Sequence, residues 1–329
     1  MRSAFLADRV MAQHFLLSAR AKTLSLASVA RMSDEEAHKR FTQIRWADNN
    51  GEPVCPRCGG VVLYTYRARK LWKCVACTHQ FSVTSGTIFA SRKLKVRDIL
   101  LAIAIFCNGA KGIPALQLSR DLKVQYRTAF VLAHKLREAM AAETQGMTLS
   151  GEVEVDGAYF GGHIRPANLA TDRVDRRLAE HQTGKRRVVV VARERSGRTI
   201  ALVTRQEADG VEIVKRVVAP GSRVHADEAA HWDQLHAHFD TRRINHTVAY
   251  SLDGACTNQA ESFLSRLRRM TDGQHHRTSP RYLYQYATHA AWLEDHRRLD
   301  NGALTRRALG LALRHPVSRQ WKGYWQRSS

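Results

Sequence analysis

Three carboxylates in the second half of the chain have the types and setting that metal-dependent chemistry requires. Asp156 and Asp227 each stand at the predicted end of a strand, and Glu261 lies on a predicted helix. Mg²⁺ prefers carboxylate oxygens, and two such ions about 3.5–4 Å apart activate an attacking oxygen and stabilise a leaving one. The three residues therefore predict a site for two divalent cations acting on a phosphodiester, with Asp156 bridging both ions. Taken singly, each residue is also interpretable as a turn cap or a solvated acid.

The helix predicted over residues 258–270 carries Glu261 and several basic residues. Each residue turns a helix by about 100°, which here separates a polar face from an apolar one. The polar face holds Asn258, Glu261, Ser265 and Arg268, and the apolar face holds Phe263, Leu264, Leu267 and Met270. Glu261 is therefore expected to point away from the core, with Arg268 placed to bind a DNA phosphate nearby. Arg266 and Arg269 are further candidate DNA contacts, and Asn258 is a candidate auxiliary group.

The segments around these acids predict a mixed α/β domain. Residues 152–156 alternate as a strand does, and the strand is expected to stop at Gly157. A continuous apolar run over 188–191 is typical of a central strand, with a hairpin partner over 199–203. Further elements are expected in the order helix 211–218, strand 221–226 and short strand 246–250. This order, with acids on two strands and a helix, is that of an RNase H-like fold.

Other ionisable residues close to the three acids are weaker candidates. His246 lies between the second and third acids, where it would lean on the metal site or protonate a leaving group. A packed histidine is the stronger interpretation of His246. Glu154 and Glu228 are neighbouring carboxylates that rank below the chosen three as metal ligands.

Four of the six cysteines predict a second, structural metal site. Cys55, Cys58, Cys74 and Cys77 follow the pattern C-x2-C-x15-C-x2-C. Thiolates at this spacing close a tetrahedral zinc site and leave no open position for chemistry, with short strands expected at 61–66, 71–73 and 80–83. A rubredoxin-like iron site and four unrelated buried thiols are the alternatives. The other two cysteines are interpreted as small buried hydrophobic residues.

A helical segment follows the zinc ribbon. Helices are predicted over 96–107, 114–122 and 125–142, and the last two resemble a helix-turn-helix. The third helix would offer basic and polar side chains to a DNA groove or to phosphates: Gln125, Arg127, Lys135 and Arg137. A plain helical connector is the alternative for this segment.

The charge of the whole chain favours a polyanionic partner. Its 52 lysines and arginines outnumber 30 acids, which gives a net charge of +22. Basic side chains release condensed counterions from nucleic-acid phosphates, so DNA is the expected partner. The longest apolar run, residues 99–107, is too short to span a bilayer, and no membrane association is expected.

Composition shifts and turn-rich stretches divide the chain into five predicted parts. They are a basic extension (1–32), a helix with the zinc ribbon (33–90), a helical DNA-binding region (91–146), an RNase H-like catalytic domain (147–300) and a basic tail (301–329). Ser33 to Glu36 reads as a capping box, so the folded protein is expected to begin there. In the tail, a helix is expected over 303–313. The aromatic residues Trp321, Tyr324 and Trp325 would stack on DNA bases unless the tail is loosely ordered.

The motifs together resemble the ISXO-like DDE transposases of bacterial insertion sequences. Their zinc ribbon is similar to the segment from Cys55-Pro-x-Cys58 to Cys74-x-x-Cys77 together with residues 80–89. Their catalytic motifs are similar to residues 154–156, 159–162, 227–228, 245–246 and 257–263. The resemblance covers about residues 33–301. It implies that Asp156, Asp227 and Glu261 form a catalytic triad binding Mg²⁺ or Mn²⁺. It further implies cleavage and joining of DNA at terminal inverted repeats and target DNA by a cytoplasmic, nucleoid-associated protein that acts as a homodimer or larger synaptic complex.

Four positions depart from the usual pattern of that family. Arg268 stands where lysine is usual, Leu264 where tryptophan is common, Ala226 where threonine is common, and Gly157 where glutamate is usual. Arginine keeps the charge of lysine but changes the contact geometry. Two other functions therefore stay open: an inactive or domesticated relative that regulates by sequence-specific DNA binding, and a structure-specific nuclease that hydrolyses without joining.

Overall fold

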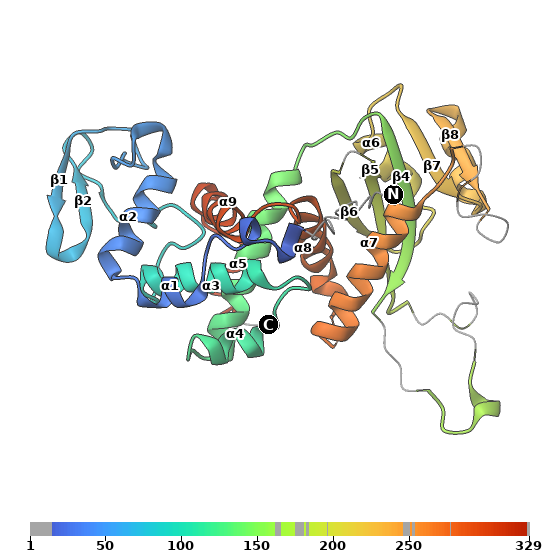
Figure 1. Ribbon diagram of the computed structural model, residues 1–329, viewed down its shortest axis with the longest axis horizontal. Coiled ribbons are helices and arrows are strands. Elements are labelled where there is room, and N and C mark those ends of the chain that lie inside the picture. Colours follow the sequence, from blue (N-terminus) through green and yellow to red (C-terminus); the bar gives the residue numbers. More distant parts are fainter. Residues whose placement is uncertain are drawn as a thin grey trace, which may run out of the picture.

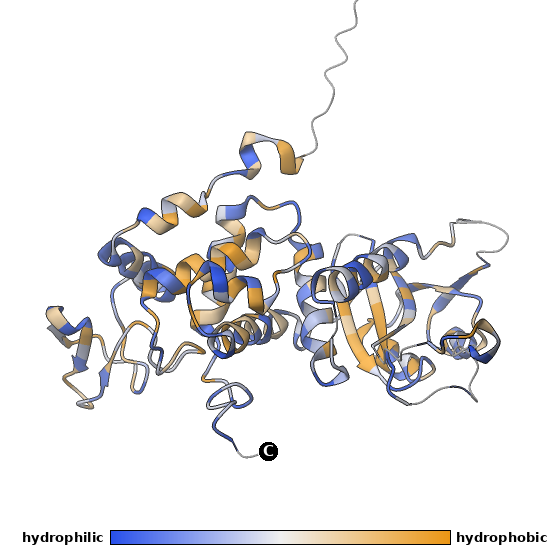
Figure 2. Ribbon diagram, turned by 90° about the horizontal axis from the view of Figure 1, so that it is seen from below, coloured by the Kyte–Doolittle hydropathy of each residue, from blue (hydrophilic) through white to orange (hydrophobic). Residues whose placement is uncertain are grey.

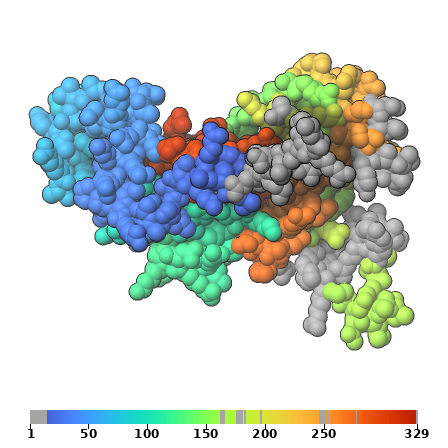
Figure 3. All heavy atoms as spheres, viewed as in Figure 1, coloured from blue at the N-terminus to red at the C-terminus, as the bar shows by residue number. Residues whose placement is uncertain are grey.

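The computed structural model describes residues 15–161, 166–174, 181, 184–195, 197–245, 251, 254–276 and 278–327. Its described part is elongated, with a small sheet at one end, helices in the middle and a larger sheet at the other end (Figure 1). The face drawn in Figure 3 is hollowed between the two ends, and residues from the C-terminal part of the chain lie at the bottom of the hollow. No helix in these ranges has the length and apolarity needed to cross a bilayer.

The small sheet is the predicted ribbon. Strands β1 (Leu63–Tyr66), β2 (Leu71–Cys74) and β3 (Gln80–Phe81) pair antiparallel in that order. Helix α2 (Asp34–Arg45) begins at the predicted capping box, in which Ser33 and Glu36 bond each other's backbone amides. Trp46 meets the ring of Trp72 edge-on, with centroids 5.4 Å apart. These aromatic contacts join α2 to the ribbon in a single core.

The folded part of the chain begins before Ser33, contrary to the prediction. Helix α1 (Leu26–Arg31) buries Val29 in the same core as α2. The backbone of Leu24 exchanges two hydrogen bonds with the side chain of Asn301, at 2.9 and 2.6 Å. The basic composition of this segment gave no sign that it is folded, because the residues that it packs against lie far away in the sequence.

The three predicted helices after the ribbon are confirmed as α3 (Val96–Asn108), α4 (Ala115–Asp121) and α5 (Tyr126–Ala141). The helix predicted at 303–313 is confirmed as α9 (Asn301–Arg314), which buries Leu309 and Leu313 against these helices. Figure 1 shows α9 beside α5. Residues 301–314 are therefore part of the helical core and not a loose tail.

The larger sheet has five strands in the order β6-β5-β4-β7-β8. They are β4 (Glu152–Phe160), β5 (Arg187–Glu194), β6 (Thr199–Thr204), β7 (Arg223–Asp227) and β8 (Asp240–Ile244). The predicted hairpin is confirmed by the antiparallel pairing of β5 with β6, whereas β7 and β8 run parallel to β4 and to each other. Strand β8 was not predicted, and the strand expected at 246–250 lies outside the described residues.

Helices cover both faces of this sheet. Helix α6 (Gly210–Val217) packs on one face with Val188 and Val190, and α7 (Asn258–Arg268) and α8 (Leu283–Asp295) pack on the other with Val189 and Val191. Alternate residues of a strand face opposite sides, so a strand covered on both faces needs a continuous apolar run. Figure 2 shows these strands as the apolar centre of this end of the molecule.

The predicted end of the first strand at Gly157 is wrong. Strand β4 continues to Phe160 because Gly157 pairs with Val190 and Phe160 pairs with Arg187 of β5. The pairing of β4 with β7 stops earlier, at Glu154. Asp156 therefore lies within a strand, just beyond the point where one of its two neighbours ends, and not at the strand's carboxyl end.

Candidate functional site

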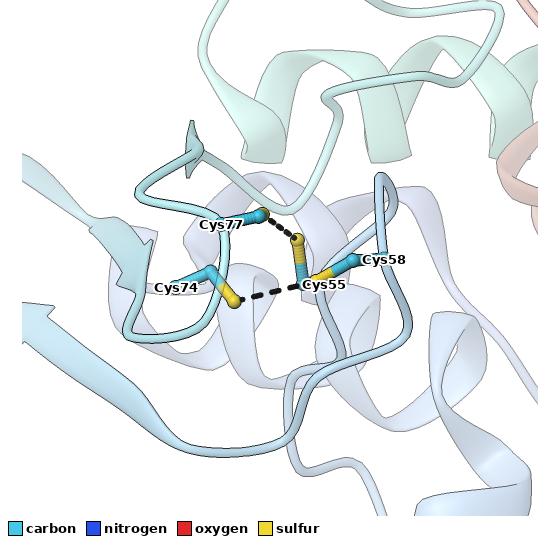
Figure 4. Close-up of side chains that lie close together, drawn as sticks. All are labelled: Cys55, Cys58, Cys74 and Cys77. Atoms are coloured by element: carbon cyan, nitrogen blue, oxygen red, sulfur yellow. Dashed lines mark hydrogen bonds between the residues drawn. The ribbon is translucent and has the colours of Figure 1, made fainter.

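The four predicted zinc ligands come together at one end of the ribbon. Cys55 and Cys58 lie in the turn before β1, Cys74 ends β2, and Cys77 follows in the next turn. Their sulfurs all lie within 4.8 Å of one another, with Cys55 Sγ 3.6 Å from Cys77 Sγ and Cys58 Sγ 3.5 Å from Cys74 Sγ (Figure 4). Tetrahedral Zn–S bonds of about 2.3 Å place sulfurs about 3.8 Å apart, whereas a disulfide needs about 2.05 Å. The spacing fits a structural zinc ion.

The ribbon backbone also comes close to these sulfurs. A Cβ atom at Gly60 would lie 3.1 Å from Cys74 Sγ and 3.4 Å from Cys58 Sγ. A side chain there would crowd two of the four ligands, so glycine suits this turn. His79 stacks on Phe81 with ring centroids 6.1 Å apart, which agrees with a histidine outside the ligand set.

The predicted acids lie on two adjacent strands of the larger sheet and on a helix that packs against it. Asp156 lies on β4, Asp227 is the last residue of β7, and Glu261 lies in the first turn of α7. Burial, together with the charges of Asp227, Glu207 and Glu261, raises the pKa of Asp156 to about 7, although a hydrogen bond from the Gly157 amide acts in the opposite direction. Glu207, which lies three residues after β6, carries no local sequence signal that marks it as part of this group.

These carboxylates are spread more widely than the cysteines. In the described ranges, the four cysteines are the only group of three or more metal-ligand side chains whose ligand atoms all lie within 4.8 Å of one another. Two cations about 3.5–4 Å apart divide their ligands between them, so a two-ion site does not require every oxygen to meet at one point. The donors are oxygens only, which suits Mg²⁺ or Mn²⁺ better than zinc.

Glu154 fixes α7 against β4, a role that sequence reasoning missed. Its side chain is fully buried, and its Oε2 accepts hydrogen bonds from the amides of Gln259 (2.7 Å) and Ala260 (3.2 Å). Its Oε1 accepts one from Arg195 Nε at 3.0 Å. A carboxylate is favourable at the amino end of a helix, where free N–H groups and the helix dipole meet it. Glu154 thus positions the helix that carries Glu261 beside the strand that carries Asp156.

Comparison with protein-family models matches two segments of the chain. Residues 148–295 match the model of the ISXO2-like transposase domain, and residues 32–80 match that of the transposase zinc-ribbon domain. The chain carries an ISXO2-like transposase domain and a transposase zinc ribbon. No curated protein and no solved structure matches it significantly.

Helix α7 of the transposase has the predicted apolar and polar faces, but one of its arginines forms an ion pair within the protein. Phe263, Leu264 and Leu267 are buried as predicted, and Asn258 and Arg268 are exposed. The Arg266 guanidinium pairs with Glu294 of α8, so this predicted DNA contact has a partner inside the protein. His246 lies outside the described residues.

Arg268 and Arg269 of the transposase border a cleft of about 490 Å³. The Arg268 guanidinium lies over the Phe160 ring, 5.7 Å from its centroid. The cleft also includes Lys111 from the loop between α3 and α4, together with Asp272, Gly273 and Gln274. Three basic side chains from two parts of the chain therefore face one solvent-accessible hollow.

On α5 the predicted DNA contacts divide into exposed and buried residues. Gln125 and Arg127 are exposed and Lys135 is half-buried. Arg137 is only 1% exposed, with its guanidinium 4.2 Å from the ring centroid of Tyr286, and its prediction as a DNA contact is wrong. The physical reason is that α4, α8 and α9 all pack against α5, which leaves a narrower free face than an isolated helix would have.

The aromatic residues of the C-terminal tail mostly serve the transposase core. Trp321 is buried and stacks on His134 with centroids 4.3 Å apart, and the hydroxyls of Tyr282 and Tyr324 are hydrogen-bonded. Trp321 and Tyr324 are therefore engaged within the protein, which corrects the expectation that both would stack on DNA bases. Trp325 is 43% exposed and lies beneath the guanidinium of Arg127.

Proposed function

We propose that this transposase cleaves and joins insertion-sequence ends by two-metal phosphoryl transfer. The observation that carries the proposal is the placement of the acids on β4, at the end of the adjacent strand β7 and in the first turn of α7, where the charges of Asp227 and Glu261 act on Asp156. The match to the transposase domain and the strand order β6-β5-β4-β7-β8, typical of an RNase H-like domain, support it.

In this mechanism the side chains would bind the cations, fix the position of α7 and neutralise a DNA phosphate. Asp156, Asp227 and Glu261 would bind Mg²⁺ or Mn²⁺, and the bound cations would activate the attacking oxygen and offset charge on the leaving one. Glu154 keeps Glu261 in place by capping α7. Arg268 would bind a phosphate oxygen, and stacking on Phe160 limits the conformations of its guanidinium.

DNA binding would be shared between several surfaces. The helices α4 and α5 are joined by a short turn with Lys123 in the left-handed region (φ 52°), as a helix-turn-helix requires a tight connection. Gln125, Arg127 and Lys135 are the α5 side chains that would reach DNA, and Arg269 would do so beside the catalytic site. We propose terminal inverted repeats and target DNA as the ligands, with a homodimer or larger synaptic complex as the acting form at the nucleoid.

The test is cleavage and joining of labelled inverted-repeat ends in the presence of Mg²⁺ or Mn²⁺. Asp156→Ala is expected to abolish both products while DNA binding persists, because the metal site and not the DNA surface is removed. Glu212→Gln is the matched control, since Glu212 is an exposed acid of α6 that pairs only with Lys215 among the described residues. Equal activity of Asp156→Ala and wild type would refute the mechanism.

The same assay distinguishes a transposase from the two alternative functions, a DNA-binding regulator and a nuclease. DNA binding with no metal-dependent cleavage of any end sequence would indicate an inactive or domesticated regulator. Cleaved ends without joined products would indicate a nuclease.

A further inference from the structure

We infer that Glu207 is a fourth carboxylate of the catalytic metal site, reaching the cations through space that Gly157 leaves open. The inference rests on the proposed function, because it adds a ligand to the site formed by Asp156, Asp227 and Glu261. It assigns a role to the loop between β6 and α6.

The first observation is a close approach between Glu207 and the backbone beside Asp156. A Cβ atom at position 157 would lie 2.6 Å from both Cγ and Oε1 of Glu207 and 2.8 Å from its Cδ. Side-chain carbons do not approach other heavy atoms so closely, so any residue larger than glycine would displace Glu207. The glycine is therefore explained by this contact, and the Glu207 carboxylate lies directly beside the residue that follows Asp156.

The loop that carries Glu207 is held at both ends. The Gly210 amide donates a hydrogen bond to the Glu207 carbonyl oxygen at 2.8 Å, and Asp209 Oδ2 accepts one from the Gln206 amide at 3.1 Å. A Cβ atom at Gly210 would lie 2.9 Å from the Trp232 ring, so the start of α6 is packed tightly against the buried tryptophan. A ligand on such a supported loop loses little conformational freedom when it binds an ion.

The electrostatic setting joins Glu207 to the other acids. Asp227 is the charged neighbour that acts on Glu207, and Glu207 in turn acts on Asp156. In the described part of the chain no hydrogen bond reaches the Glu207 carboxylate, and His231 Nε2 lies 4.0 Å from its Oε1, beyond hydrogen-bonding distance. The Glu207 side chain is only 22% exposed, so a charge on it is poorly solvated, and these side chains do not supply a partner.

Charge balance supplies the chemical reason for a fourth ligand. Two divalent cations carry four positive charges, and Asp156, Asp227, Glu261 and Glu207 together carry four negative ones. The number of ligand charges tunes affinity for hard cations. Glu207 would therefore increase the affinity for metal before DNA contributes its own oxygens.

The test measures metal binding without DNA. Mn²⁺ titrations of the full chain, followed by electron paramagnetic resonance of the free ion, are expected to show about tenfold weaker binding for Glu207→Gln. The substitution preserves shape and removes the charge. Glu212→Gln on the neighbouring helix is the control and is expected to bind Mn²⁺ as wild type does. Wild-type affinity in Glu207→Gln would overturn the inference.

Two further variants distinguish the possible failures. Gly157→Ala is expected to weaken Mn²⁺ binding as Glu207→Gln does, and the double variant is expected to be no worse than Glu207→Gln, because both changes remove one interaction. Additive losses would overturn the inference. Asp156→Asn is the reference: if it lowers Mn²⁺ affinity while Glu207→Gln does not, the inference fails and the proposed function stands. If neither variant lowers the affinity, the metal site itself is refuted.

Discussion

At the scale of single residues, the ionised form of Asp156, one of the proposed metal ligands, costs stability. Asp156 is half-buried on β4, and its acidic neighbours make its ionisation still less favourable. Its folded-state pKa of about 7 lies above the 3.8 of a free aspartate. A site arranged to attract cations stores like-charge repulsion, which is the usual source of a conflict between activity and stability.

Asp156→Asn is therefore expected to stabilise the metal-free protein. Removing the charge should raise the free energy of unfolding at pH 7.5 by on the order of 2 kcal/mol, less than the full pKa difference because the site relaxes. The folded state holds a proton that the unfolded state loses between pH 3.8 and about 7, so wild type loses stability relative to the variant as pH rises through this window. The gain should thus shrink as pH falls from 7 towards 4.

Urea unfolding at several pH values, with Glu212→Gln as the control, measures this gain. Addition of Mg²⁺ should stabilise wild type but not Asp156→Asn, since ligands stabilise only the state that binds them. A variant that is less stable than wild type at pH 7.5 would contradict the account of Asp156.

At the scale of elements, local patterns predicted most helices and strands and failed where distant parts decide. The periodic apolar residues of α3, α4 and α5 and the cysteine spacing of the ribbon are local signals, and these elements match prediction closely. Glycine at position 157 predicted the end of a strand. The strand continues because Gly157 pairs with Val190 of β5, a residue that is distant in the sequence. Arg137 looked exposed because Tyr286, which covers it, is distant in sequence.

The candidate site divides in the same way. Asp156, Asp227 and Glu261 were predicted from residue type and order, and the structure places Asp156 within range of the charges of the other two. The positions of Glu154 and Glu207 were not predicted. Glu154 is held by backbone amides at the amino end of α7, and Glu207 occupies space that is open only because Gly157 has no side chain. Neither relation is visible in a local pattern.

Glu154→Gln is expected to loosen α7 and to lower activity without touching a proposed metal ligand. The substitution leaves Arg195 without its closest buried acid and places an amide NH₂ against backbone N–H groups, so a loss of about 3 kcal/mol in unfolding free energy is expected. Chemical denaturation measures the loss, and Mn²⁺ affinity should fall because Glu261 moves with the helix. Glu152→Gln, which removes a half-exposed acid from the same Arg195, is the matched control. Equal stability of the two variants would contradict a capping role for Glu154.

At the scale of the whole molecule, α8 connects the helical part to the larger sheet. Ala287 and Ala291 pack beneath the sheet with α7, whereas Trp292 belongs to the core of α3, α5 and α9. Between α8 and α5 lie His289, His134 and Arg137, all buried; among the described residues, both ring nitrogens of the two histidines and the Nε and Nη2 of Arg137 have no hydrogen-bond partner. Any change that charges this junction should therefore act on both parts together.

The junction predicts acid sensitivity. Burial holds the pKa of His289 well below 6.5, and the charges of Arg137, His275 and His134 lower it further. A histidine that stays neutral when folded but gains a proton when unfolded contributes stability above pH 6.5 that is lost as pH falls. Each such group costs about 1.4 kcal/mol per pH unit below that value. His289→Phe keeps a flat ring against Phe106 and should lose correspondingly less stability between pH 7 and 5.

The comparison with wild type isolates this effect, because the raised pKa values of Asp156, Glu207 and Asp295 act in the opposite direction but are common to both proteins. Urea unfolding at pH 7 and pH 5 should give wild type a loss about 2 kcal/mol larger than that of His289→Phe. His236→Phe, at an exposed position, should follow wild type. Parallel pH profiles for wild type and His289→Phe would show that His289 takes up a proton in the folded protein. A protonated junction would then require a water path or a rearrangement between α5 and α8.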